Sequence, residues 1–200
     1  MRRLLPPLLL ILLLLALLIA LLLWQGPSRT SHLSPPPQGG DFLLQGPQGP
    51  VALSNFRGQV VVLYFGYTWC PDICPTSLAV LAAAINALDA EQQQQVHGLL
   101  VSVDPERDDL PRLLEYTAYF HPRILGLVGE EELLHSIAGQ YGAAFQRVAG
   151  ESENYPVDHS ADLYLIDRQG RLRETLPHGT LPQQLLDSLQ RLLAEPPGAA

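Results

Sequence analysis

The chain has 200 residues, of which 20 are acidic and 12 are basic, and its formal net charge at pH 7 is −8. Every basic residue is an arginine, and the acidic balance argues against nucleic acid as a partner, because such binding depends on clustered positive charge. Two cysteines are too few to staple a domain with disulfides. The domain must therefore be stabilised by its core, which leaves both thiols free for chemistry.

The first residues predict a membrane anchor. Arg2 and Arg3 precede Leu4–Trp24, which is almost wholly apolar, and the uninterrupted part, Leu8–Trp24, would form a helix about 26 Å long, close to the hydrocarbon thickness of a bilayer. A cleaved signal peptide is the alternative, but such peptides usually have a shorter apolar core and a small-x-small cleavage site. We therefore expect residues 1–25 to be a retained transmembrane helix, with its basic end in the cytoplasm and the rest of the chain on the outer face.

A linker and one globular domain are expected to follow. Residues 26–40 are rich in proline and serine and have no apolar periodicity, as is typical of a linker. Residues 41–194 are long enough for a single domain with a core, and residues 195–200 predict a disordered tail. At the start of the domain, Asp41–Leu44 and Val51–Leu53 flank a turn rich in glycine and proline, which predicts a β-hairpin that covers a sheet edge.

Both cysteines lie between a predicted strand and a predicted helix. Val60–Phe65 is a continuous β-branched and aromatic run, typical of a strand buried on both faces. A helix is expected from Pro75, a favoured first helical residue, to Leu88, with Cys70 in the preceding turn and Cys74 near the helix cap. At such a junction, unpaired backbone N–H groups and the positive end of the helix favour thiolate over thiol. Both sulfurs should therefore be good ligands and good nucleophiles.

The spacing of this CxxxC pair leaves three interpretations open. Cys70 and Cys74 could form a structural disulfide, act as a thiol-disulfide redox pair, or supply two of the ligands of a soft metal ion. The pair lacks the two-residue gap of thioredoxin-like redox motifs, and no second CxxC is present to complete a zinc site.

An acidic cluster follows the next predicted strand. Glu91–Gln95 is expected to be an exposed connection, and Val96–Val103 predicts a strand that ends at Asp104–Asp109. In a parallel α/β sheet, the loops at the carboxyl ends of the strands gather here. We favour a helix N-cap with a surface turn for this cluster, and the alternative is a loop that supports a site or faces a partner.

The remaining elements complete an α/β pattern. Helices are expected over Leu110–Phe120, Glu130–Tyr141 and Leu181–Leu193, strands over Ile124–Val128, Ala143–Val148, Ala161–Ile166 and Leu172–Leu176, and a polar loop over Gly150–Val157. This order predicts a thioredoxin-like α/β fold with an N-terminal hairpin and insertions, preceded by one transmembrane helix. In such a sheet the first strand-to-helix junction and the loop before the late hairpin meet at one edge, which brings His159 toward Cys70 and Cys74.

Three segments resemble the Sco/SenC family of membrane-anchored copper proteins, which take part in the assembly of cytochrome oxidase. They are Tyr67–Pro75, Val103–Asp108 and Tyr155–Ser160, and the resemblance extends from about Asp41 to Leu193. It implies a thioredoxin-like fold, a single N-terminal anchor in the inner (cytoplasmic) membrane and a domain on the periplasmic or outer face.

The resemblance also implies a metal site and a function for this site. In that family the two motif cysteines and the late histidine bind one copper ion, as Cu(I), Cu(II) or both, and these residues correspond to Cys70, Cys74 and His159. The expected function is delivery of copper to the dinuclear copper site of cytochrome c oxidase, with the copper-acceptor subunit as partner and other copper chaperones or thiol reductases as further partners.

The residue types agree with this expectation on chemical grounds. Two thiolates and an imidazole form a soft set suited to Cu(I), and the same atoms can hold Cu(II) with an added oxygen donor. A structural zinc site normally closes with four protein ligands, and the sequence offers no further cysteine. We expect no metal role for the other histidines, which are His32, His97, His121, His135 and His178.

Two other functions would use the same cysteines. A thiol-disulfide oxidoreductase would reduce the cysteines of the copper-acceptor site, with Cys70 and Cys74 as its redox pair, and a peroxidase-like sensor would use one cysteine of low pKa. Disulfide exchange has no evident need for His159, so this residue favours the metal-binding interpretation. We therefore expect a metallochaperone rather than an enzyme.

Overall fold

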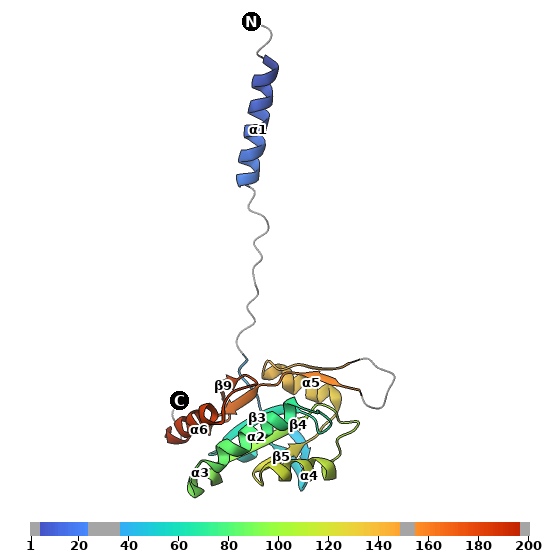
Figure 1. Cartoon of the computed structure of the whole chain (residues 1–200), viewed down its shortest axis with the longest axis vertical. Helices are drawn as coiled ribbons and strands as arrows, with labels where there is room; N and C mark the ends of the chain where they lie inside the picture. The colour runs from blue at the N-terminus through green and yellow to red at the C-terminus, as the bar shows by residue number, and fades with distance from the viewer. Residues whose placement is uncertain (1–4, 24–36, 149–154, 197–200) are drawn as a thin grey trace. The chain divides into compact units, whose positions relative to one another are not determined.

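The computed structural model describes residues 5–23, 37–148 and 155–196, and Figure 1 labels their helices and strands. Parts of four predicted segments lie outside these ranges: residues 1–4, 24 and 25 of the anchor, residues 26–36 of the linker, residues 150–154 of the polar loop and residues 197–200 of the tail. The chain divides into two units, residues 1–35 and residues 36–200.

The first unit contains helix α1, Leu5–Leu23. Its described side chains, those of residues 9–21, are apolar and exposed to solvent. Over the ranges that the structure describes, no helix combines the length and the apolar character needed to cross a bilayer.

The second unit is built on a five-stranded sheet with the order β5-β4-β3-β8-β9. Its strands are β3 (Val60–Gly66), β4 (Val96–Ser102), β5 (Ile124–Leu127), β8 (Leu163–Ile166) and β9 (Leu172–Leu176). The central strand β3 runs parallel to β4 and antiparallel to β8, so that Leu63 pairs with Leu99 on one side and with Tyr164 on the other. All seven residues of β3 are buried, as its continuous apolar run predicts.

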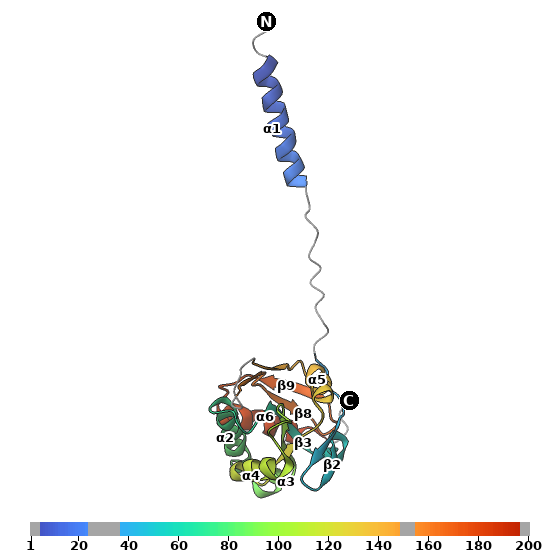
Figure 2. The ribbon, with the colours of Figure 1, turned by 90° about the vertical axis from the view of Figure 1, so that its right-hand side faces the viewer.

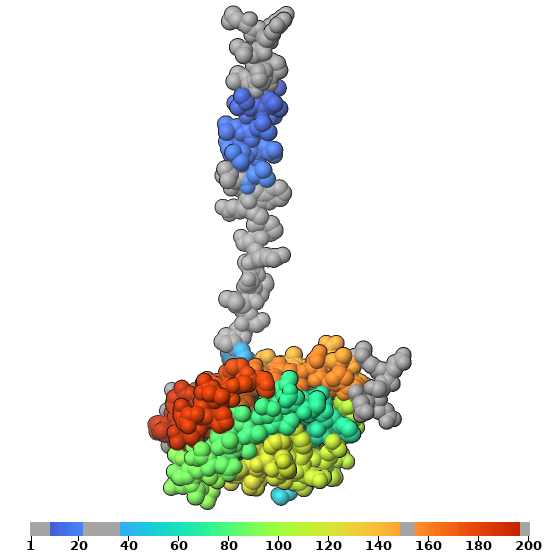
Figure 3. Space-filling view, viewed as in Figure 1, coloured from blue at the N-terminus to red at the C-terminus, as the bar shows by residue number. Residues whose placement is uncertain are grey.

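Helices cover both faces of this sheet. They are α2 (Ile73–Asn86), α3 (Ala90–Gln94), α4 (Leu110–Phe120), α5 (Glu131–Gln140) and α6 (Pro182–Ala194). Figure 2 shows α2 and α4 on one side of the sheet and α5 on the other, and Figure 3 shows α6, α2 and α4 side by side on one face. Neighbouring residues of β3 alternate between the layers, so that the Tyr64 hydroxyl faces α2 while the Phe65 ring packs 6.1 Å from the Tyr141 ring after α5.

The predicted N-terminal hairpin is confirmed. Strands β1 (Leu43–Gly46) and β2 (Gly49–Ala52) pair antiparallel, and a single 3-10 turn, Leu53–Phe56, leads on to β3. The backbone of Gln45 in β1 exchanges two hydrogen bonds of 2.9 Å with Val128, directly after β5. The hairpin therefore covers the edge of the sheet at β5.

One predicted helix boundary and one predicted connection are wrong. Helix α2 begins at Ile73 rather than at Pro75, because the first four N–H groups of a helix need no intrahelical partner and proline is tolerated there. The expected exposed connection Glu91–Gln95 instead forms the short helix α3, because the Asp89 carboxylate accepts the Gln92 N–H at 2.8 Å and caps it.

A small ribbon lies outside the main sheet. Strand β6 (Phe145–Arg147) pairs antiparallel with β7 (Val157–His159), and the pairing places Phe145 opposite His159. The sequence predicts a loop up to Val157 and no strand between this loop and Ala161, so it misses β7. Pairing between segments so far apart in the chain leaves no local periodic signal in three-residue strands.

The packing of β4 against α2 gives a test of the fold. A Cβ atom at Gly98 would lie 2.8 Å from Leu81 Cδ2 and 3.0 Å from Ile124 Cγ1, so Gly98→Ala should lower the free energy of unfolding by about 1–3 kcal/mol through overpacking. Gly139→Ala is the matched control. The added Cβ would have no heavy atom within 4 Å apart from its chain neighbours and the backbone of its own helix, and this change should stabilise α5 by about 0.5–1 kcal/mol. Urea unfolding measures both, and unchanged stability of Gly98→Ala would contradict the packing.

Candidate metal centre

The cysteine pair lies where β3 passes into α2. The chain leaves β3 at Gly66, and Cys70 ends the connecting turn, in which its N–H donates to the Tyr67 carbonyl at 3.4 Å. Cys74 is the second residue of α2, and its backbone N–H donates to Cys70 Sγ at 3.4 Å. The N-cap residue Asp72 makes no side-chain cap. A sulfur atom therefore accepts one of the N–H groups that the start of a helix leaves without an intrahelical partner.

The two thiols are free and differ in environment. Cys70 is partly exposed, whereas Cys74 is fully buried. The hydrogen bond from the Cys74 thiol is the main cause that lowers the pKa of Cys70, to about 4, and the backbone N–H of Cys74 contributes in the same direction. The same hydrogen bond and burial raise the pKa of Cys74. Without metal, Cys70 is therefore the thiolate and Cys74 holds the shared proton.

His159, at the end of β7, faces the pair. Its Nε2 lies 3.4 Å from Cys74 Sγ, and its Nδ1 lies 3.0 Å from the carbonyl oxygen of Ser160. Because a carbonyl can only accept, Nδ1 carries the proton and Nε2 presents its lone pair to the sulfur atoms. The rings of Tyr64 and Tyr67 pack edge-on against the imidazole at 6.1 and 5.8 Å and hold its plane.

The structure brings the three predicted residues together. One ligand atom from each of Cys70, Cys74 and His159 can be chosen so that all lie within 4.8 Å of one another. Two sulfur donors and one imidazole nitrogen fit a soft metal ion, and the hydrogen bond to Nδ1 fixes the ligating tautomer. That these atoms ligate a metal stays a prediction.

The other described histidines have different surroundings. Nε2 of His97 lies 3.0 Å from an Arg123 guanidinium nitrogen, Nδ1 of His121 accepts the Arg123 N–H, His135 stacks on Phe145, and Nδ1 of His178 lies 3.2 Å from Ser77 Oγ. His32 lies outside the described residues.

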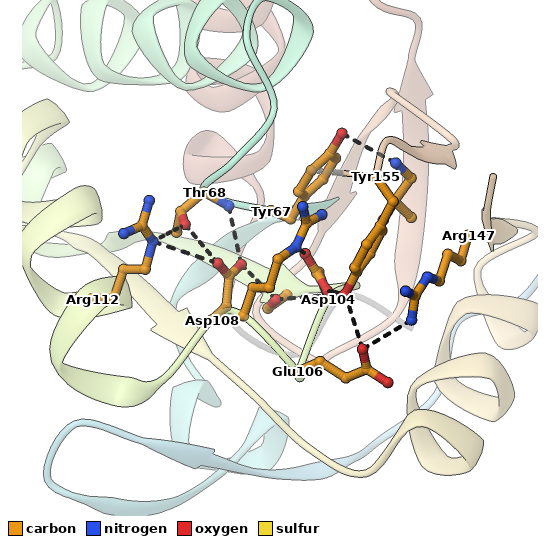
Figure 4. Close-up of polar contacts among 11 residues, drawn as sticks. Tyr67, Thr68, Asp104, Glu106, Asp108, Arg112, Arg147 and Tyr155 are labelled. Atoms are coloured by element: carbon orange, nitrogen blue, oxygen red, sulfur yellow. Dashed lines mark hydrogen bonds and ion pairs between the residues drawn. The ribbon is translucent and has the colours of Figure 1, made fainter. Parts of the chain in front are cut away.

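The buried carboxylate of Asp108 accepts hydrogen bonds from the cysteine loop. Asp108 is 1% exposed, and it accepts the Thr68 N–H at 3.0 Å, the Thr68 hydroxyl at 2.5 Å and the Ser102 hydroxyl at 2.7 Å (Figure 4). Burial raises the pKa of Asp108 although these three hydrogen bonds oppose the shift. The loop is thus fixed two residues before Cys70.

The prediction for the acidic cluster is right in one part and wrong in another. Asp109 caps α4 by accepting the Arg112 N–H at 2.8 Å, as expected. Asp104 and Asp108, however, are buried rather than part of a surface turn, because they supply acceptors to the loops around the metal centre. The sequence does contain one signal for this supporting role, because the cluster lies directly after a predicted strand.

The two halves of the centre also contact each other directly. The Tyr67 hydroxyl, next to the cysteine loop, accepts the N–H of Val157 at 3.2 Å, so it joins that loop to the strand that carries His159. The sequence indicates only packing or docking for Tyr67 and Trp69. Trp69 does remain 46% exposed, beside a groove of about 510 Å³ lined by Tyr67, Trp69, Pro71, Arg107, Tyr155 and Pro156.

Fold and site together define a thioredoxin-like protein of the Sco type, with a CxxxC pair and a distal histidine. The family model described as SCO1/SenC matches residues 30–194, and the chain belongs to this family.

Curated relatives support the assignment. The mitochondrial SCO2 homolog of Mus musculus is 37% identical over 177 residues, which cover 86% of this chain and 69% of that protein. The Bos taurus counterpart is 39% identical over 160 residues, which cover 78% of this chain and 59% of that protein.

Two solved structures are similar over most of the domain. Apo Sco1 from Thermus thermophilus has 40% sequence identity and a TM-score of 0.72, and the match covers 82% of this chain and 95% of that one. ScoI from Arabidopsis thaliana, solved with copper bound, has 34% identity and a TM-score of 0.70, and the match covers 78% of this chain and 97% of that one.

The unequal thiols predict a distinctive pH dependence of alkylation. A thiol with the ordinary pKa of 9 would react about tenfold faster for each pH unit between pH 6 and 8, whereas Cys70, with its pKa lowered to about 4, is already thiolate over this range. Iodoacetamide should therefore modify Cys70 before Cys74 in the reduced metal-free protein, at a rate that is nearly constant from about pH 6 to 8 and falls only as the pH approaches 4.

Peptide mass spectrometry after timed quenching identifies the modified residue. Cys70→Ser is the control and should react slowly, because Cys74 is fully buried. A tenfold rise in the Cys70 rate per pH unit would show that the Cys74 thiol does not stabilise the thiolate.

Proposed function

We propose that this chain is a membrane-anchored copper metallochaperone that binds one copper ion through Cys70, Cys74 and His159. The observation that carries the proposal is the convergence of two sulfurs and an imidazole nitrogen within 4.8 Å, in a chain of the SCO1/SenC family. The copper-bound state of Arabidopsis ScoI, a similar structure, supports copper as the metal. The destination we propose is the dinuclear copper site of cytochrome c oxidase, with its copper-acceptor subunit as partner.

The donor set suits both oxidation states of copper. Two thiolates satisfy Cu(I), which accepts low coordination numbers and soft ligands, and the imidazole adds a donor that Cu(II) favours. The Cys70 thiolate is available for a metal at neutral pH, while the Cys74 proton must leave when a metal binds. A structural zinc ion would lack a fourth protein ligand from this group.

Transfer to a partner needs an accessible ligand. Cys70 is partly exposed, and the exposed side chains of Trp69 and Ile73 flank it, at 46% and 39% exposure. An acceptor that packs on these apolar groups could bring its own thiolates to the Cys70 side of the site. Other copper chaperones or thiol reductases could use the same face to load the site or keep it reduced.

A thiol-disulfide oxidoreductase is the second candidate, favoured by the lowered pKa and the exposure of Cys70. The Cys70 thiolate would attack an acceptor disulfide and form a mixed disulfide, and Cys74 would then attack Cys70 Sγ and release the acceptor as a dithiol. This chain would be left with a Cys70–Cys74 disulfide, which a thiol reductant must reduce again. In that oxidised form it has no thiolates for Cu(I).

We further propose residues 1–25 as the anchor, 26–40 as the linker, 41–194 as the copper-binding domain and 195–200 as the tail. The apolar run Leu8–Trp24, preceded by Arg2 and Arg3, supports insertion in the inner membrane with the domain on the periplasmic or outer face.

His159→Ala should separate copper binding from thiol chemistry. Wild type should bind one copper ion per chain, and loss of the imidazole should weaken Cu(II) binding by at least about 10 to 100-fold, the range found for changes beyond the ligands themselves. Disulfide exchange should survive, because it needs a thiolate and access. Competition with a chelator measures affinity, and exchange with a model disulfide and oxidase assembly are measured in parallel.

His97→Ala is the matched control, because His97 pairs with Val61 at the start of β3, whereas the cysteines follow its end. It should leave copper affinity unchanged. If oxidase assembly survives in His159→Ala while copper binding is lost, the metallochaperone is rejected in favour of the oxidoreductase.

The membrane arrangement is tested by protease added to intact spheroplasts. The domain from Asp41 onward should be removed, while a tag placed at the N-terminus stays protected. Protection of the domain, or release of a mature chain that begins after Trp24, would contradict the proposed anchor.

A further inference from the structure

The position of His159 depends on contacts outside the main sheet. Its strand, β7, pairs with β6 in a two-stranded ribbon, and the five-stranded sheet that carries the cysteines does not include this ribbon. Cys70 and Cys74 follow β3, so no strand pairing among the described residues fixes the distance between the sulfurs and the imidazole. Residues 160–162 join His159 to β8, which pairs with β3, so the chain tethers one end of the ribbon. Side-chain contacts must set how closely the rest of the ribbon approaches the cysteine loop.

Tyr155, close before β7, makes the most extensive of these contacts. It is 6% exposed, and the guanidinium carbons of Arg107 and Arg147 lie 3.6 and 3.5 Å from its ring centroid. Two planar groups cannot share one face of the ring at such distances, so the arginines stack on opposite faces. The ring is thus clamped between the turn after β4 and the end of β6.

The hydroxyl of Tyr155 also holds the side chain in place, through contacts with two carboxylates. It lies 2.8 Å from Asp104 Oδ1 and 3.1 Å from Glu106 Oε2 (Figure 4). Glu106 and Arg147 form an exposed ion pair at 3.0 Å, which contributes little, whereas Asp104 is 3% exposed. The buried bond to Asp104 is therefore the stronger constraint. Burial and this carboxylate raise the pKa of Tyr155 to about 12, in keeping with a protonated phenol that donates to Asp104.

The turn that holds Tyr155 also holds the cysteine loop. The Asp108 N–H donates to the Asp104 carbonyl at 3.0 Å, and the Asp108 carboxylate accepts two hydrogen bonds from Thr68. Asp104–Asp108 is thus a common support, bonded through Asp108 to the loop of Cys70 and through Asp104 to the start of the His159 strand.

We infer that Tyr155 is a positioning residue for the third copper ligand, setting the distance of His159 from Cys70 and Cys74 through its bond to Asp104. The inference rests on the proposed copper function and deepens it. Because two thiolates suffice for Cu(I) while Cu(II) draws on the imidazole, Tyr155 acts on the relative affinity of the site for the two oxidation states. Its loss weakens Cu(II) binding more than Cu(I) binding.

Tyr155→Phe tests this, because it removes the hydroxyl and keeps the ring between the arginines. We expect Cu(II) affinity to fall by about 10-fold or more, with weaker nitrogen hyperfine coupling in the Cu(II) spectrum, and a smaller change for Cu(I). Tyr141→Phe is the matched control: this tyrosine is 1% exposed, and its hydroxyl donates to the Gly40 carbonyl at 2.7 Å. Copper binding by Tyr141→Phe should equal that of wild type.

A second readout needs no metal. In the metal-free protein, Tyr155→Phe should speed amide hydrogen exchange at Val157, whose N–H donates to the Tyr67 hydroxyl, and at Ser160, whose N–H donates to the Ala144 carbonyl. Tyr141→Phe should leave both amides unchanged. Unchanged exchange and unchanged Cu(II) affinity in Tyr155→Phe would overturn the inference.

A double-mutant cycle asks whether Tyr155 acts through His159. In the His159→Ala background, Tyr155→Phe should cause no further loss of Cu(II) affinity, because the ligand it positions is gone. If Tyr155→Phe lowers Cu(II) affinity in the His159→Ala background as much as in wild type, the positioning role is overturned, even if copper binding itself is confirmed. If wild type binds no copper, the proposed function fails, and the exchange readout still decides whether Tyr155 holds the ribbon.

Discussion

The metal centre depends on one buried carboxylate, that of Asp108. A carboxylate out of water is costly unless its oxygens are bonded, and this one accepts two hydrogen bonds from Thr68 and one from Ser102. The Arg112 guanidinium, 3.9 Å away, adds a favourable charge, and it also lies over the Trp69 ring at 4.4 Å. The cysteine loop therefore has a fixed course before any metal arrives, which lowers the entropic cost of assembling the ligands.

Rigidity of this kind explains how one fold can place ligands from distant parts of the chain. Cys70 and Cys74 lie at a strand-to-helix junction, and His159 lies on a ribbon more than eighty residues later. The turn Asp104–Asp108 contacts both segments, and Tyr67 bonds directly to Val157. Among the described residues no strand pairing joins the ribbon to the main sheet, and an acidic, partly buried turn connects them instead.

The sequence predicted the features that leave a local signal. The apolar run of β3, the amphipathic α4 and α6 and the turn-bounded hairpin strands have clear patterns, and the CxxxC pair is visible by spacing alone. The approach of His159 followed from topology and from the family resemblance.

Features that depend on contacts between distant segments could not be predicted in this way. The pairing of β6 with β7 joins distant segments, and the burial of Asp104 and Asp108 depends on contacts with Tyr155 and Thr68, 51 and 40 residues away, so neither has a periodic pattern. The early start of α2 was missed for a different reason: Pro75 is a favoured first helical residue but lies further inside the first turn, where it is also tolerated, and the Cys74 N–H before it is accepted by Cys70 Sγ.

Because the two sulfurs differ in exposure, a partner can reach only one of them directly. Cys70 is accessible at the surface, whereas Cys74 is buried between Tyr64 and the first turn of α2. If the chain binds copper as proposed, a competing thiolate could reach the bond to the exposed Cys70 sulfur first and the bond to the buried Cys74 sulfur last. Retention and release are then governed by different atoms, so that the site could hold its cargo firmly against water and still yield it stepwise to a partner that docks.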